Sequence, residues 1–232
     1  MSMPRKVRCE VGSITDHGGR VYTVDLVPAS PVPFFHPGQF LHLTVDEYDP
    51  ASFWPESRVF SIASSPRDRH RIRICYAVKG RYTTRMEQQL KVGGTVWIKL
   101  PYGDFIVDES QDTVLIAGGT GISAFTAFLE ALTPSHPHKV TLIYGARSPS
   151  LFLFQDMIQK VPNLDVIYFA ETDAQPPCLP GRISLDEVGS SVSSPRSPVF
   201  YLSGPPVMLT ALGADLKARG IPADRIRIDA WE

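Results

Sequence analysis

The sequence predicts a two-domain protein, in which an antiparallel β-barrel is followed by an α/β domain with a doubly wound parallel sheet. Up to about residue 108, short alternating runs of apolar and polar residues are separated by turn residues, as in small barrels. Further on, continuous apolar runs alternate with helical stretches, which is typical of a parallel sheet with helical crossovers. The polar stretch 108–112 marks the boundary, so we expect domains of residues 1–108 and 109–232.

The barrel domain should contain several short strands of period two and one helix, at 84–90, with Thr83 as its N-cap. Alternating runs predict strands at 7–14, 21–27, 39–45, 71–78 and 95–100, and a further strand is expected from Arg58. The second domain should contain five buried strands separated by three helices. These strands are expected at 114–117, 140–144, 166–169, 199–202 and 226–228, and the helices at 122–132, 150–160 and 206–219.

Composition excludes several classes of protein. The 23 lysines and arginines nearly balance 24 acidic residues, so no basic patch for nucleic acid or anionic lipid is indicated. The longest apolar runs, about five residues, fall far short of a membrane helix, and the first residues do not resemble a signal peptide. Three scattered cysteines predict neither a metal site nor a disulfide framework. We therefore expect a cytoplasmic protein, a monomer, without a membrane span or a bound metal.

The segment from Arg58 to Ser64 carries the first signal for a binding site, with an arginine, an aromatic residue and a serine along one expected strand. A guanidinium can grip two phosphate oxygens at once. Phe60 can pack against a flat ring, and the Ser61 hydroxyl can bond a ring nitrogen. An ordinary barrel strand with one exposed and one buried side chain explains the same residues equally well.

A second signal follows about twenty residues later, where an expected strand ends near Gly80 and a helix begins near Thr83. Backbone amides at such a helix start can receive a phosphate. A common β-to-α turn is the alternative interpretation. Arg58 supplies a cation and this segment a helix N-terminus, and a pyrophosphate bridge would require both.

Two further signals lie in the second domain. The segment 118–123 reads G-G-T-G-I-S between an apolar run and a helical stretch, which is a strand–turn–helix pattern of the nucleotide-binding kind. A tight turn for close helix packing is the alternative there. Ser203 and Gly204 end a late apolar run, at the edge where open α/β sheets bind ligands, and Pro205 or Pro206 can open the next helix.

In this order, the motifs resemble the ferredoxin–NADP⁺ reductase superfamily, in which a flavin-binding barrel precedes a nicotinamide-nucleotide domain. The resemblance covers nearly the whole chain. It includes an R-x-[YF]-S motif, a glycine and hydroxyl residue at a helix start, a P-[FY]-G-x-F segment, G-G-T-G-I, Y-G-x-R, and C-G-P-P-x-M with serine for cysteine. The matching positions are Arg58, Phe60, Ser61, 80–84, 101–105, 118–122, Tyr144, Gly145, Arg147 and 203–208.

The resemblance implies bound FAD and NADH or NADPH as electron donor. Arg58 would bind a flavin phosphate, Phe60 would lie against the isoalloxazine or ribityl group, and Ser61 would bond near flavin N5. The other implied flavin contacts are Val59, Tyr76, Val78, Gly80, Tyr82, Thr83 and Thr84. Of these, Gly80, Tyr82 and Thr83 would hold the pyrophosphate and adenosine end. The implied contacts with the nicotinamide nucleotide are Gly119, Thr120, Gly121, Arg147, Gly204 and Pro205.

The resemblance also implies three residues close to the hydride path, namely Ser61, Ser203 and Trp231. Ser203 stands where many family members have cysteine. Because this chemistry needs positioning more than a nucleophile, we expect slower transfer at most. Trp231 resembles the C-terminal aromatic residue that covers the flavin in some members, and an aromatic residue that pins a terminal strand is the equally weighted alternative.

The implied activity is that of an FAD-dependent NAD(P)H oxidoreductase that passes electrons to an external acceptor. The acceptor could be a ferredoxin, a flavodoxin, an oxygenase component, free flavin or a ferric chelate. A reductase of free flavin and a non-catalytic flavin-binding subunit remain as alternatives. The helix start, with Tyr82 nearby to pack on adenosine, favours tight FAD over FMN. Glu171 and Asp173 against the single Arg147 favour NADH over NADPH.

Overall fold

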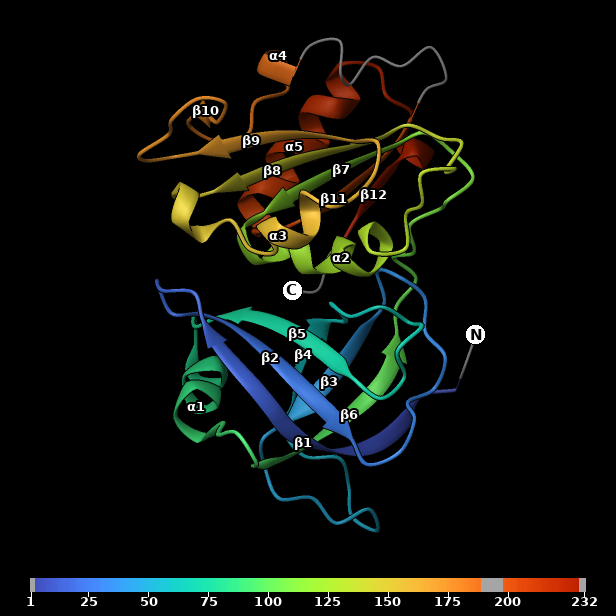
Figure 1. Ribbon diagram of the computed structural model, residues 1–232, viewed down its shortest axis with the longest axis vertical. Coiled ribbons are helices and arrows are strands. Elements are labelled where there is room, and N and C mark those ends of the chain that lie inside the picture. The colour runs from blue at the N-terminus through green and yellow to red at the C-terminus, as the bar shows by residue number, and fades with distance from the viewer. Residues whose placement is uncertain (1–2, 189–197, 230–232) are drawn as a thin grey trace. The chain divides into compact units, whose positions relative to one another are not determined.

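The structure is a computed structural model that describes residues 3–188 and 198–229. The chain divides into two compact units (Figure 1). The first comprises residues 1–106 together with 126–128, and the second comprises 107–125 and 129–232. Each unit is built on its own six-stranded sheet, one antiparallel and one parallel, which confirms the predicted fold class.

The sheet of the first unit has the strand order β4-β3-β6-β1-β2-β5. Its strands alternate between buried and exposed side chains, as in β1, where Val7, Cys9 and Val11 enter the core between exposed residues. Beyond the end of β4, the Ala63 amide donates to the Arg73 carbonyl of β5 at 2.8 Å, so the two edge strands close toward a barrel. The strand bounds are β1 (Arg5–Asp16), β2 (Val21–Pro28), β3 (Phe40–Thr44), β4 (Arg58–Ser61), β5 (Ile72–Ala77) and β6 (Thr95–Tyr102).

One helix, α1 (Arg81–Gln89), follows β5, three residues earlier than the sequence predicted. Gly80 is the N-cap, and Thr83 lies inside the first turn rather than at the cap. The Thr83 hydroxyl accepts hydrogen bonds from the amides of Lys79 and Gly80 at 3.0 and 3.1 Å. The expectation that Thr83 caps the helix is therefore wrong, because its side chain reaches back to the cap from the third helical position.

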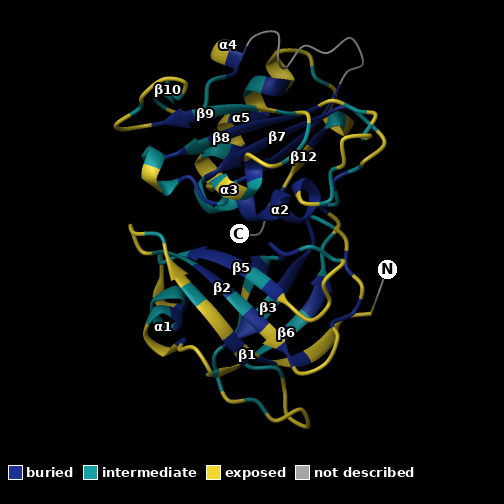
Figure 2. Ribbon diagram, viewed as in Figure 1, coloured by how far each residue is buried: buried dark blue, intermediate teal, exposed yellow. Residues whose placement is uncertain are grey.

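The sheet of the second unit has the order β10-β9-β8-β7-β11-β12, and all its strands are parallel. Every residue of β7 is buried, as expected for a strand that is covered on both faces (Figure 2). The strand bounds are β7 (Thr113–Gly118), β8 (Val140–Ala146), β9 (Leu164–Ala170), β10 (Leu179–Pro180), β11 (Val199–Ser203) and β12 (Ile226–Ile228). The five predicted strands are present, and the two-residue β10 was too short to be seen as a pattern.

The helices of the second unit depart further from expectation. A 3₁₀ turn, η1 (Gly119–Ile122), precedes α2 (Ser123–Leu129), whereas α5 (Pro206–Ala218) lies close to its predicted range. The predicted helix 150–160 is wrong, because only η2 (Pro149–Leu151) and α3 (Gln155–Ile158) form there. Phe154 between them is left-handed, with φ of 59°, and this conformation interrupts a helix. The remaining short elements are α4 (Leu185–Val188) and η4 (Ala223–Arg225).

Within residues 3–188 and 198–229, no helix is long and apolar enough to cross a membrane. The same part of the chain contains no group of three or more histidine, cysteine, aspartate or glutamate side chains arranged to hold a metal ion.

Candidate functional site

Strand β4 places Arg58 at the start of the R-V-F-S segment, where its side chain is about half exposed. Its guanidinium carbon lies 5.1 Å from the centre of the Tyr82 ring, and one nitrogen lies 3.8 Å from the Glu56 carboxylate. The guanidinium is therefore oriented by an aromatic face and a carboxylate while much of it remains accessible. This is the arrangement expected of a cation that receives a phosphate.

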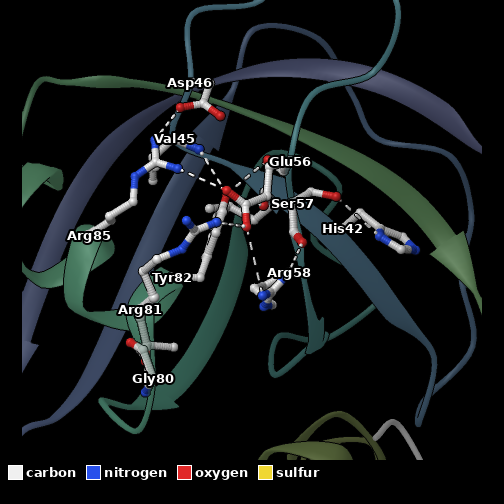
Figure 3. Close-up of polar contacts among 12 residues, drawn as sticks. His42, Val45, Asp46, Glu56, Ser57, Arg58, Gly80, Arg81, Tyr82 and Arg85 are labelled. Atoms are coloured by element: carbon white, nitrogen blue, oxygen red, sulfur yellow. Dashed lines mark hydrogen bonds and ion pairs between the residues drawn. The ribbon is translucent and has the colours of Figure 1, made fainter.

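Arg58 belongs to a cluster in which three arginines surround Glu56 (Figure 3). Arg81 and Arg85 approach its two carboxylate oxygens at 3.1 and 3.2 Å, and Arg85 also pairs with Asp46. Three cations against two acids leave a net charge of +1 at this place. Arg81 and Arg85 were not predicted, although their spacing of four residues at a helix start was a readable signal, because it puts both side chains on one face.

The N-terminus of α1 lies in the same part of the barrel (Figure 3). The first amides of a helix have no acceptor within the helix, and the helix dipole makes this end attractive to anions. Arg81 is its first residue, and 82 % of the Arg81 side chain is exposed. The helix start and the arginine cluster thus offer two adjacent kinds of phosphate ligand, backbone N–H groups and guanidinium groups.

Tyr82 is not available to pack against adenosine, so that expectation is wrong. Its side chain is 2 % exposed and belongs to the barrel core. The hydroxyl donates to the Leu43 carbonyl at 2.9 Å and accepts from the Val45 amide at 3.3 Å. Tyr82 therefore joins α1 to the end of β3, and it orients Arg58 through its ring face.

The aromatic residues predicted to contact the flavin are also largely enclosed. Phe60 is 9 % exposed and Tyr76 is 3 % exposed, and their ring centres are 6.1 Å apart in the barrel core. Burial raises the pKa of the Tyr76 hydroxyl above its usual range. Val59, Ser61 and Val78 are partly exposed, so these positions and the backbone are the accessible part of the predicted contact surface.

The glycine-rich loop of the second unit follows β7, as predicted. Gly119 has φ of 54°, and a side-chain carbon added there would meet nothing within 4 Å. At Gly121, the same carbon would lie 2.3 Å from the Ser203 carbonyl oxygen. The loop therefore needs glycine for conformation at the first position and for close packing at the second, and it leaves open space at Gly119 and at the partly exposed Thr120.

A second loop, after β11, packs directly against the first. An added carbon at Gly204 would lie 3.0 Å from the Gly118 Cα atom, and one at Gly118 would lie 2.9 Å from the Pro205 ring. Pro206 then opens α5 at the first helical position, where proline is well tolerated. The structure brings the predicted segments 118–122 and 203–208 together at the carboxyl edge of neighbouring strands β7 and β11.

Ser203 ends β11, and its hydroxyl donates to Oδ2 of Asp229 at 2.8 Å. The Asp229 side chain is 5 % exposed, and its Oδ1 has no hydrogen-bond partner among the described residues. Burial raises the pKa of Asp229 to about 7. Sequence reasoning missed Asp229, although an acidic residue directly after an apolar strand run was a usable signal. Trp231, the third expected catalytic residue, lies outside the described residues.

Arg147 follows β8, with its side chain exposed. Its carbonyl accepts hydrogen bonds from the amide and the hydroxyl of Thr172 at 2.8 and 3.1 Å, so the segment after β9 lies beside it. Glu171 in that segment pairs with Arg182 at 3.6 Å. The acid expected to repel a 2′-phosphate is therefore partly neutralised by an arginine that sequence reasoning did not consider.

The two sets of residues fit the cofactors that the motifs imply. The arginine cluster and the start of α1 suit the phosphates of a flavin nucleotide, and the loop at Gly119 suits the pyrophosphate of a dinucleotide. Each set belongs to one unit, and the two sheets that carry them are built independently.

Comparison with known proteins supports this description. Residues 115–213 match the family model described as the oxidoreductase NAD-binding domain. A flavohemoprotein of Rhizobium meliloti is 24 % identical over 90 % of this chain and 56 % of its own length. The reductase component of propane 2-monooxygenase from Mycolicibacterium smegmatis is 25 % identical over 97 % of this chain and 67 % of its own. The chain thus spans about half to two thirds of these two relatives.

The structure of the Amycolatopsis cytochrome P450 reductase GcoB has the same fold. It superposes with a TM-score of 0.83 at 24 % identity, covering 98 % of this chain and 70 % of that one. The chain therefore has the two-domain fold of that reductase, a barrel sheet followed by a parallel sheet, and the second domain contains the matched NAD-binding segment. The chain is thus similar in sequence to a flavohemoprotein and to a monooxygenase reductase component, and in fold to solved reductases.

Proposed function

We propose that the protein is an NAD(P)H-dependent flavoprotein oxidoreductase that passes electrons from a reduced nicotinamide, through FAD, to an external protein acceptor. One observation carries this proposal. Two phosphate-binding arrangements of different construction, the arginine cluster with α1 and the glycine loop after β7, lie on the two sheets of one chain. A donor nucleotide and a flavin nucleotide each need one of them.

In this proposal the residues bind and orient, while the flavin, when bound, converts two-electron hydride chemistry into one-electron transfer. Arg58 and Arg81 hold the flavin phosphates, and Ser61 supplies a hydroxyl at the ring. Gly119 and Thr120 present backbone to the pyrophosphate of the donor. The domain roles follow, with residues 1–108 binding FAD and residues 109–232 binding NAD(P)H.

The relatives suggest the kind of acceptor. The propane 2-monooxygenase relative is named as a reductase component, as are terephthalate 1,2-dioxygenase and phenol 2-monooxygenase relatives. We therefore propose an oxygenase component or a comparable redox protein as the electron acceptor of this chain. The names of these three relatives support this choice. Measuring electron transfer from the isolated protein to such an acceptor tests it.

A second candidate function, reduction of free flavin, is favoured by the burial of Tyr82. Because Tyr82 is buried, it offers no aromatic surface to the adenosine end of FAD, which then makes fewer contacts with the protein. The affinity for a flavin that lacks adenosine would therefore be reduced less, relative to FAD. The two functions differ in whether the flavin stays bound as a cofactor or leaves as a product.

Purification followed by anaerobic titration with NADH and NADPH separates the candidates. A yellow protein that bleaches with either donor and reduces ferricyanide supports the flavoprotein reductase. A colourless protein that consumes NAD(P)H only when flavin is added supports the flavin reductase. A yellow protein that neither donor bleaches would contradict both, and would support a flavin-binding subunit without catalytic activity.

A further inference from the structure

A single buried hydroxyl joins two loops of the nucleotide-binding unit. Tyr144 lies in β8 and is fully buried. Its hydroxyl donates to the Gly119 carbonyl at 3.2 Å and accepts from the Leu153 amide at 3.1 Å. Gly119 begins the glycine loop after β7, and Leu153 lies in the segment that follows β8. The tyrosine thus connects the ends of two neighbouring strands through one oxygen atom.

The bond to Gly119 has a geometric consequence for the next residue. The peptide between Gly119 and Thr120 is trans, so its carbonyl and its N–H point in opposite directions. Because the carbonyl is held toward the buried Tyr144 hydroxyl, the Thr120 N–H is directed away from the core. The partly exposed Thr120 therefore presents its amide on the open side of the loop.

Packing against the neighbouring loop holds the glycines on either side of Gly119 but not Gly119 itself. Gly118 and Gly121 pack closely against the loop after β11. A side-chain carbon added at Gly118 would lie 2.9 Å from the Pro205 ring, and one added at Gly121 would lie 2.3 Å from the Ser203 carbonyl oxygen. Gly119 has open space around it and a positive φ. It begins η1, so its carbonyl is also an acceptor in the 3₁₀ turn, and the Tyr144 hydroxyl is the described side-chain contact that bonds the same carbonyl from the core.

We propose that Tyr144 is a positioning residue for the nicotinamide nucleotide, whose hydroxyl orients the Gly119–Thr120 peptide so that the Thr120 N–H binds the pyrophosphate. This inference rests on the proposed function of the chain. It deepens that function, because it makes nucleotide affinity depend on a side chain that is buried behind the loop. The bond to Leu153 stabilises the same hydroxyl in the position that the Gly119 bond requires.

Tyr144→Phe isolates the hydroxyl from the ring. The ring packs edge-on against Phe152, with centres 5.0 Å apart, and phenylalanine keeps this contact. Tyr201→Phe is a matched control, because Tyr201 is 2 % exposed in β11 of the same sheet and its hydroxyl accepts from the Asp108 amide at 2.9 Å. Both variants lose a buried hydroxyl that pairs with a backbone amide, but only Tyr144 also bonds the glycine loop.

The test measures KM and kcat for the preferred donor, with ferricyanide as acceptor, on the flavin-loaded protein. One hydrogen bond that binds or orients a charged ligand changes affinity by about tenfold. We expect Tyr144→Phe to raise KM by about that factor with kcat changed less than about twofold, as for loss of uniform binding. Tyr201→Phe should leave KM unchanged, while both variants keep their flavin.

Equal KM values in the two variants would overturn the inference, and so would a fall in kcat at unchanged KM. If the wild type does not oxidise NAD(P)H at all, the proposed function fails and this inference fails with it. Amide hydrogen exchange on the wild-type holoprotein decides the matter if Tyr144→Phe does not fold. Adding NAD⁺ should then slow exchange of the Thr120 amide by about tenfold or more, and unchanged exchange would overturn the inference.

Discussion

The Ser203 hydroxyl and the Asp229 carboxylate form a buried hydrogen bond of 2.8 Å at the carboxyl edge of the parallel sheet. Asp229 is held there by its own backbone as well, because its amide donates to the Leu202 carbonyl at 2.9 Å. Burial favours the neutral carboxylic acid, whereas the bond from Ser203 favours the carboxylate. Burial is the larger effect, so the pKa of Asp229 rises to about 7.

This pKa predicts how stability depends on pH. Between the pKa of an unfolded aspartate, about 3.9, and the folded value of about 7, the folded protein binds more protons than the unfolded chain. The free energy of unfolding contributed by Asp229 therefore falls as pH rises from about 4 to 7, and it is constant above that range. Each pKa unit corresponds to about 1.4 kcal/mol, so a shift of about three units gives a total change on the order of 4 kcal/mol.

Asp229→Asn should remove this pH dependence, because asparagine does not titrate and keeps an acceptor for Ser203. Denaturant unfolding of both proteins between pH 4.5 and 8 measures the difference in their free energies of unfolding. The contributions of all other titrating groups are the same in both proteins and cancel in this difference. Relative to the variant, the wild type should lose stability as pH rises. Ser203→Ala should shift the end of the slope to higher pH, since its loss removes a bond to the charged form. Parallel stability curves for wild type and Asp229→Asn would contradict the prediction.

Arg58→Ala should weaken flavin retention far more than folding. A charge-assisted contact with a phosphate is worth about 1.5–3 kcal/mol, which is about ten- to a hundredfold in affinity. The ion pair of Arg58 with Glu56, at 3.8 Å on a half-exposed side chain, should add at most about 1 kcal/mol to stability. Flavin titration of the apoprotein and thermal unfolding measure the two effects.

Arg20→Ala is the control, because Arg20 is a similarly exposed arginine of the barrel that pairs with Glu87, outside the arginine cluster. It should keep the flavin affinity of the wild type. If Arg58→Ala retains flavin normally but melts early, Arg58 has a structural role and the flavin-phosphate assignment is wrong.

The glycine loop predicts two different costs of adding a methyl group. Gly121→Ala would place a carbon 2.3 Å from the Ser203 carbonyl, so the loops must separate, at about 1–3 kcal/mol or more. Gly119→Ala meets open space and bears only the strain of a positive φ, about 1–2 kcal/mol. Denaturant unfolding should therefore show a larger loss for Gly121→Ala. The reverse order would show that the two loops are less closely packed than described.

The fold was predictable because its signals are periodic. Alternating runs such as the one that became β1 and buried runs such as β7 depend on local sequence, and the motifs fixed where the loops fall. The segment 149–158 was not predictable in the same way. Its composition suits a helix, but Phe154 is left-handed and the Leu153 amide donates to the Tyr144 hydroxyl of β8, and no local pattern records that tertiary contact.

The sequence predicted the residues of the candidate site that belong to motifs, but not the side chains that contact them in the folded protein. Arg58 lies at the start of strand β4 and Gly119 lies in the loop after β7, as their motifs predicted. The Glu56 carboxylate that gathers three arginines, and the Asp229 carboxylate 26 positions from Ser203, depend on chain segments that only folding brings together. Tyr82 was misjudged because an aromatic residue near a helix start can face either solvent or core.

FAD, rather than FMN, should be the flavin released when the pure protein is boiled. In the proposed site, the N-terminus of α1 and Arg81 would provide ligands for a second phosphate beyond the one assigned to Arg58. Chromatography of the released flavin identifies it. Because Tyr82 is buried and contributes no adenosine contact, Arg81→Ala should cost affinity for FAD but leave binding of FMN nearly unchanged. FMN alone in the extract would contradict this prediction.

The preferred donor should be NADH, by a small margin. A 2′-phosphate carries close to two negative charges and needs cations around it, whereas a ribose hydroxyl can donate to a carboxylate. Glu171 and Asp173 oppose the phosphate, while Arg147 attracts it, and the hydrogen bonds between Thr172 and the Arg147 carbonyl keep these residues side by side. Arg182 pairs with Glu171 at 3.6 Å and reduces its repulsion, so the preference should be less than about tenfold.

Single substitutions should then move the preference in opposite directions. Exposed charges at this range contribute on the order of 1 kcal/mol, or up to about fivefold each. Arg182→Ala exposes the full charge of Glu171 and should increase the NADH preference, whereas Glu171→Gln should shift the ratio toward NADPH. The measurement is the ratio of kcat/KM for the two donors, with ferricyanide as acceptor. A wild-type ratio of about tenfold in favour of NADPH would reverse the prediction and make Arg147 the 2′-phosphate ligand, in which case Arg147→Ala should abolish the preference.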